Sequence, residues 1–205
     1  NNTITTPNVG MRLQSGSSFN MVLNNNFTVT GGDVGGAISI DAADNTISNN
    51  IITQTTNTRA GIDLSGNANT LLNNTITMPN GNTCYGVYRG GIYLVGSTNN
   101  IINNTIQNSG CGIYFDSAGL NNTLSGNQVN TSAGQSYVLY GTLVSHYNQS
   151  IDSSNLAEGK PVNYTFNGQN LVINHNNSFG QVICGWCNNV TYDDVNVSGG
   201  DGINL

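Results

Sequence analysis

Charged residues are scarce in this chain. Of its 205 residues, 4 are Lys or Arg and 10 are Asp or Glu, so 7% are charged, whereas an average soluble domain has about 25%. A net charge of −6 with four basic residues excludes a protein that holds nucleic acid or anionic lipid through a basic patch. No stretch approaches the roughly 20 apolar residues of a membrane-spanning helix. We therefore expect neither a nucleic-acid partner nor a membrane span.

Helical periodicity is also missing, and a short repeat takes its place. Residues 60–64 (AGIDL) are followed by 73–77 (NNTIT), and residues 90–94 (GGIYL) by 103–107 (NNTIQ). The chain has nine such units. Their first apolar residues run from position 11 to position 203 and so span 192 residues, which gives a mean period of 24 over eight intervals. Apolar residues open these units, the last four less clearly than the first five: Met11, Ile38, Ile62, Ile92, Ile113, Val138, Val162, Val182 and Ile203.

Short alternating strands that repeat at this period, separated by Asn, Gly and Ser turns, are typical of a parallel β-helix. We predict an all-β, single-stranded parallel β-helix of about nine coils over residues 1–205. We expect it to be right-handed, because connections between parallel strands of one sheet are almost always right-handed. The chain opens on the second half of a unit (NNTIT) and closes on a first half (GINL). We therefore expect a segment of a longer solenoid, or a unit that stacks head-to-tail on its neighbours.

The abundance of asparagine has a physical reason in such a fold. The chain has 38 Asn and 26 Gly, nearly a third of its residues. Equivalent residues of successive coils lie about 4.8 Å apart and form a column along the axis. Like charges at this distance repel one another, whereas stacked amides can form hydrogen bonds from coil to coil. We predict a buried asparagine ladder, and we assign the left-handed backbone of the turn to the same residues. One position is Asn in six units: Asn2, Asn25, Asn50, Asn74, Asn104 and Asn127.

These units resemble a known family. The G-I-x-L and N-N-T-I repeats resemble the right-handed β-helix repeats of NosD-like proteins, also grouped as carbohydrate-binding and sugar-hydrolysing (CASH) domains. Residues 155–164 (NLAEGKPVNY), 180–184 (GQVIC) and 187–191 (CNNVT) look like stretches found in secreted archaeal and bacterial members. The resemblance implies the fold and an extracellular or cell-surface location. It implies no catalytic residue, because the family shares no catalytic motif that maps onto this chain.

Four cysteines allow three pairings. Cys111 and Cys184 lie three predicted coils apart, about 14 Å along the axis, whereas a disulfide needs Cα atoms within about 7 Å. We therefore predict a disulfide between Cys84 and Cys111. Cys184 and Cys187 have the C-x-x-C spacing, but the residues that follow predict a strand rather than the helix of a redox motif. They either form a local disulfide or leave Cys184 as a buried apolar residue.

Outward-facing side chains are the candidates for binding and catalysis. Tyr93 and Tyr114 fall on adjacent coils, with Tyr85 and Tyr88 in the preceding loop. They form either a platform for sugar rings or an aromatic pair that stiffens the sheet. Asp63 and Asp41 lie a predicted diagonal of about 8 Å apart, a spacing that suits an inverting glycosidase. Arg12, Arg59 and Arg89 align with no acid cluster in this register, and we expect no metal site and no cofactor.

Eleven N-x-S/T sequons occur, of which Asn148, Asn163 and Asn121 are our candidates for N-glycosylation in a secreted setting. The function that the sequence favours is an extracellular structural solenoid, a stalk, sheath or fibre subunit that associates head-to-tail. A carbohydrate-binding module is the alternative, and a polysaccharide hydrolase or lyase is a weaker one.

Overall fold

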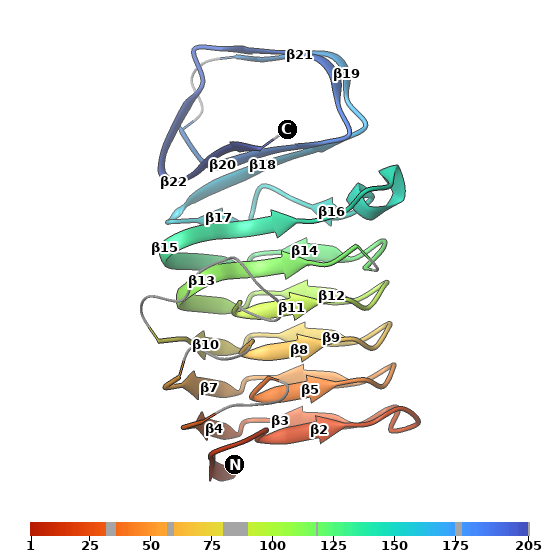
Figure 1. Ribbon diagram of the computed structural model, residues 1–205, viewed down its shortest axis with the longest axis vertical. Helices are drawn as coiled ribbons and strands as arrows, with labels where there is room; N and C mark the ends of the chain where they lie inside the picture. The colour runs from red at the N-terminus through yellow and green to blue at the C-terminus, as the bar shows by residue number, and fades with distance from the viewer. Residues whose placement is uncertain (32–35, 57–59, 80–89, 118, 175–177, 205) are drawn as a thin grey trace.

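The computed structural model describes residues 1–31, 36–56, 60–79, 90–117, 119–174 and 178–204. The chain forms a parallel β-helix whose coils stack along the long axis (Figure 1). Strands of one coil pair in parallel with those of the coils above and below, as in the register of Ile52 with Ile76. The predicted all-β solenoid is confirmed.

Three faces make up each coil as far as β17. Face 1 consists of β2 (Met11–Leu13), β5 (Ile38–Ile40), β8 (Ile62–Leu64), β11 (Ile92–Leu94) and the second halves of β13 (Thr105–Phe115) and β15 (Gln128–Leu139). Face 2 consists of β3 (Met21–Leu23), β6 (Thr46–Ser48), β9 (Thr70–Leu72), β12 (Asn100–Ile102), β14 (Thr123–Ser125) and β16 (Ser150–Ile151). Face 3 consists of β1 (Thr3–Thr6), β4 (Asn26–Val29), β7 (Ile51–Gln54), β10 (Thr75–Thr77), the first halves of β13 and β15, and β17 (Leu156–Ala157).

The alternation of apolar and polar residues builds the core. The central residue of most face 3 strands is fully buried, as are Ile76 and Ile106, and burying each such side chain stabilises the fold by about 1.5–3 kcal/mol. The glycine of the G-I-x-L repeat makes room for this column. A Cβ on Gly91 would lie 2.2 Å from Cγ2 of Ile106, so a larger residue there would displace the isoleucine.

Stacking changes after β17. A turn at Glu158 and Gly159, both with positive φ, reverses the chain, so β18 (Lys160–Phe166) pairs with β17 in antiparallel fashion. Wider coils follow (Figure 1): β18, β20 (Ser178–Gly185) and β22 (Asn196–Asn204) pair in parallel on one side, and β19 (Gln169–Asn174) with β21 (Asn188–Asp193) on the other. A 3-10 helix, η1 (Val144–Tyr147), protrudes before β16.

The later part of the predicted register is corrected by this change. Tyr137, not Val138, continues the series opened by Met11, because Ile113 pairs with Tyr137. Val182 and Ile203 do pair with each other, but the partner of Val182 in the preceding strand is Asn163 rather than Val162. Where two apolar residues are adjacent, as in Tyr137-Val138, the repeat pattern does not show which of them points into the core. The prediction was wrong by one residue for this reason.

Candidate functional site

The predicted asparagine ladder is confirmed and runs one rung further. Asn74 shows the pattern: its Oδ1 accepts hydrogen bonds from the backbone N of Asn50 (3.0 Å) and from Nδ2 of Asn50 (3.0 Å). Its own Nδ2 donates to Oδ1 of Asn104 (2.9 Å) and to the carbonyl of Ile47 (2.8 Å). The predicted members from Asn25 onward are buried, and Asn155 extends the column beyond Asn127.

A second ladder, which the sequence analysis missed, lies at the corner before face 2. Asn45 repeats the pattern of the first ladder, because its Nδ2 and backbone N both donate to Oδ1 of Asn69 (3.2 and 2.8 Å). The column ends at Gln149, whose Oε1 accepts a hydrogen bond from Nδ2 of Asn122. Its members are Asn20, Asn45, Asn69, Asn99, Asn122 and Gln149.

The left-handed backbone of the turns belongs to a different residue from the ladder, which corrects the prediction. Asn24, Asn49, Asn73 and Asn103 have φ between 54° and 58°, and each precedes a ladder asparagine. In the N-N pair, therefore, the first Asn provides the backbone conformation that few residues tolerate, and the second provides the buried amide.

Gln181, in the G-Q-V-I-C stretch, connects the first stack to the later coils. Its side chain is fully buried; Nε2 donates to the carbonyl of Tyr137 (2.7 Å), and Oε1 accepts from the backbone N of Tyr137 (3.0 Å). The amide therefore satisfies the edge of β15 as a neighbouring strand would. Gly180 allows this approach, because a Cβ there would lie 2.0 Å from the carbonyl oxygen of Ala157.

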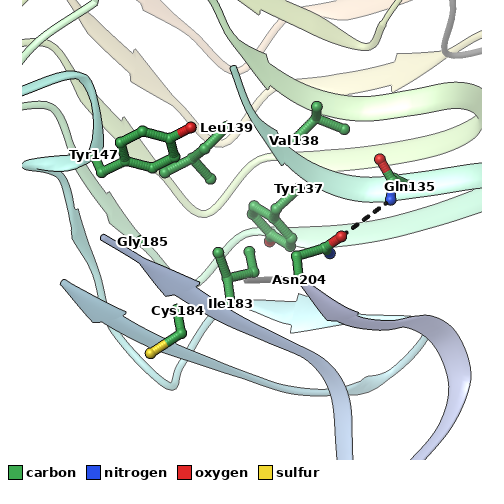
Figure 2. A pocket seen from close by; sticks show the side chains of 9 residues that line it. All are labelled: Gln135, Tyr137, Val138, Leu139, Tyr147, Ile183, Cys184, Gly185 and Asn204. Atoms are coloured by element: carbon green, nitrogen blue, oxygen red, sulfur yellow. Dashed lines mark hydrogen bonds between the residues drawn. The ribbon is translucent and has the colours of Figure 1, made fainter. Parts of the chain in front are cut away.

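A cavity of about 160 Å³ lies beside this junction, between β15, η1, β20 and the end of β22. Figure 2 shows Tyr137 and Ile183 within it, and a hydrogen bond of 3.4 Å from Nε2 of Gln135 to Oδ1 of Asn204 closes one side. The hydroxyl of Tyr137 donates to the carbonyls of Asn127 and Leu156 (3.2 and 3.3 Å). Burial raises the pKa of Tyr137, and Asp152 adds to the shift.

The tyrosine platform is a stacked column rather than an open surface. Tyr93 and Tyr114 stack at 5.7 Å between ring centroids, and Tyr114 stacks on Tyr140 at 6.5 Å. Tyr93 is only 6% exposed, and its hydroxyl donates to Oδ2 of Asp116. Burial, then Asp116 and Tyr140, raise the pKa of Tyr114. The nearly buried Tyr93 stacked on Tyr114 has the arrangement of the stiffening pair that was the alternative, and sugar binding at these tyrosines stays a prediction.

Tyr85 and Tyr88, the other members of the predicted platform, lie outside the described residues, as do Arg59 and Arg89. Within the described ranges, the binding surface expected around Tyr93 therefore reduces to the half-buried Tyr114 and to Tyr140, which is 57% exposed. Sequence analysis did not name Tyr140, because it lies two residues past the register partner of Tyr114.

The two acidic residues predicted for glycoside hydrolysis, Asp41 and Asp63, each contact a neighbouring side chain. Both guanidinium contacts of Arg12 go to Oδ2 of Asp41 (2.7 and 2.9 Å), so Arg12 pairs with a single acid, which was not predicted. Asp63, which pairs in register with Ser39, accepts from the hydroxyl of Ser65 (3.1 Å). With its carboxylate held by Arg12, Asp41 is not poised as a second catalytic acid.

The cysteines form disulfides wherever the structure describes them. Cys184 bonds Cys187, with Cα atoms 5.6 Å apart, which decides between the two alternatives for this pair. The following residues form β21, as predicted. Cys111 is buried and disulfide-bonded; its predicted partner, Cys84, lies outside the described residues, so that pairing stays a prediction.

The three candidate glycosylation sites differ in exposure. Asn148 and Asn121 are exposed, and Nδ2 of Asn148, the atom that would carry a glycan, donates to Oδ1 of Asn121 (2.7 Å). Asn163 is half-buried in β18. Modification at any of them stays a prediction.

An open groove of about 530 Å³ lies between η1 and the turns that flank β19 and β21. Its lining combines two aromatic rings, Tyr147 and Trp186, whose centroids are 6.2 Å apart, with the side chains of Asn167, Gln169, Cys187 and Asn188. None of these six residues was named as a binding candidate from the sequence, since they come from three separate segments.

Neither a metal cluster nor a membrane-spanning helix is found within the described ranges. No three His, Cys, Asp or Glu side chains there lie close enough together to hold a metal ion. No helix in this part of the chain has the length and apolar character needed to cross a membrane.

No family model, no curated protein and no solved structure matches the chain.

Proposed function

We propose that this chain is a structural β-solenoid, a rigid spacer in an extracellular or cell-surface stalk, sheath or fibre. The observation that carries the proposal is the pair of amide ladders. They run along two corners of the coils up to β17, beside one continuous apolar core. The ladder amides are buried and bonded along the stack, where they hold neighbouring coils together.

The location rests on the cysteines and on the family resemblance. Cys184 and Cys187 are bonded to each other, and Cys111 is disulfide-bonded. Disulfides persist in oxidising compartments and are rare in the cytosol. A secreted structural protein explains these bonds together with the low charge and the closed ladders.

Head-to-tail association belongs to the same proposal. Stacked coils expose strand edges at each end of a solenoid, and such edges pair with other chains unless charge or a cap prevents it. Sedimentation velocity of the purified chain over a concentration series tests this. We expect elongated species that grow with concentration, and a compact monomer at every concentration would contradict the proposal.

A further inference from the structure

Trp186 is the only tryptophan in the chain, and it lies at an exposed turn. It sits in the turn between β20 and β21, closed by the Cys184–Cys187 disulfide, with a φ of 58°. Its side chain is 52% exposed. Turn residues throughout this solenoid share that conformation, among them Phe19 (φ 62°) and Thr98 (φ 58°), so it belongs to the turn and not to a binding role. The turn therefore displays the indole rather than burying it.

The groove beside this indole has the composition of a ligand site. Its volume of about 530 Å³ lies within the range of about 300–1,000 Å³ seen for small-molecule pockets. The ring of Tyr147 tilts by 36° from the indole, so the two rings form an angled aromatic wall. Ligand pockets in general combine aromatic walls with a few oriented polar groups.

Exposed amides supply those polar groups. Asn167, Gln169 and Asn188 are exposed, whereas the ladder amides are buried and bonded to one another. Each amide offers two donors and one acceptor oxygen, which suits the paired donor and acceptor character of sugar hydroxyls. Among the described residues, no charged side chain lines the groove.

We propose that this groove binds a neutral oligosaccharide, with one pyranose ring packed on Trp186 and its hydroxyls bonded to Asn167, Gln169 and Asn188. The aromatic wall covers the apolar C–H face of the sugar, and the amides fix its orientation. The site is independent of the structural role, because none of these side chains belongs to a ladder. It also differs from the tyrosine platform expected on face 1.

The single tryptophan makes the test specific to this groove. Emission from Trp186 is recorded while cellotetraose, mannotetraose or chitotetraose is added, with tetragalacturonate as the charged comparison. We expect a saturable change with at least one neutral sugar at millimolar concentration or below, and at least tenfold weaker binding of the charged one. No saturable change with any of the three neutral sugars, or equal binding of the charged one, would overturn the proposal.

Variants assign the binding to the ring and the amides. Trp186→Asn removes the indole while keeping a residue that tolerates the left-handed backbone, and calorimetry should show at least tenfold weaker binding. Gln169→Ala should weaken binding several-fold. Val172→Ala, 62% exposed on the same strand and outside the groove, should bind as the wild type does. Unchanged affinity in Trp186→Asn would refute the site, while the melting temperatures of the variants report separately on the solenoid.

Discussion

At the scale of single residues, the chain divides its asparagines between two tasks. In the four N-N pairs from Asn24 to Asn104, the first residue adopts a left-handed backbone and the second buries an amide that bonds the neighbouring coils. The cost of burying a polar group is offset only when all of its hydrogen bonds are made. A ladder member is therefore sensitive to substitutions that an exposed asparagine would tolerate.

Asn74→Leu tests this sensitivity. The change leaves the backbone N of Asn50, the carbonyl of Ile47 and Oδ1 of Asn104 each short of a partner. At about 1–3 kcal/mol for an unsatisfied buried group, we expect a clear fall in the melting temperature. Asn100→Leu is the matched control, because Asn100 is an exposed residue of β12. Equal melting temperatures for the two variants would show that the ladder does not stabilise the fold.

Tyr137 makes the fold sensitive to alkali. Burial raises its pKa above the ordinary tyrosine value of about 10, so the folded state holds the proton more tightly than the unfolded state. That contribution is complete below pH 10 and is lost as the pH rises further, by up to about 1.4 kcal/mol per pH unit. Denaturation midpoints measured from pH 8 to pH 11.5 should fall less steeply for Tyr137→Phe.

The control for this experiment is Val172→Ala, a change at a 62% exposed residue that removes no titrating group. It should keep the wild-type pH dependence. The same slope in wild type and Tyr137→Phe would mean that Tyr137 does not titrate with unfolding.

At the scale of elements, the sequence predicted the first stack well and the later coils poorly. The N-N-T-I strands repeat almost unchanged, so face 3 and the first ladder could be predicted. The second ladder shows only one Asn per unit, after a variable residue. A constant spacing was its signal, because each member from Asn20 to Asn122 lies five residues before a member of the first ladder.

The coils after β17 had no comparable signal. Register partners of neighbouring coils are 21 to 30 residues apart from Thr3 to Leu156 (92 to 113 and 75 to 105 are the extremes). The spacing then falls to 19 between Val162 and Gln181. The groove at Trp186 could not be predicted either, because its walls come together only through this changed stacking.

Gln181 is the side chain on which the attachment of the later coils depends most. Gln181→Met has a similar shape but leaves the backbone N and carbonyl of Tyr137 unpaired, at about 1–3 kcal/mol each. We expect the emission of Trp186, which reports on the later coils, to change at a lower temperature than far-ultraviolet circular dichroism, which reports on the whole chain. Gln128→Met, an exposed residue of β15, is the control and should keep the two transitions together as in the wild type. Transitions that also coincide in Gln181→Met would contradict the role given to this residue.

At the scale of the whole molecule, cohesion is uneven along the axis. The first ladder and the apolar core are continuous from Asn25 to Asn155, whereas in the second ladder Nδ2 of Asn99 has no hydrogen-bond partner among the described residues. Beyond β17 the inward residues of β19 and β21 are only half-buried. In a solenoid each coil is stabilised mainly by its neighbours, so local stability should follow this difference.

Hydrogen–deuterium exchange of the native chain, resolved by mass spectrometry, tests the central claim that buried amide ladders and one core hold the coils together. We predict the slowest backbone exchange in β6 to β14 and markedly faster exchange in β19, β21 and β22, because exchange requires local opening. Uniform exchange along the axis, or slower exchange in the coils after β17 than in β6 to β14, would contradict the account.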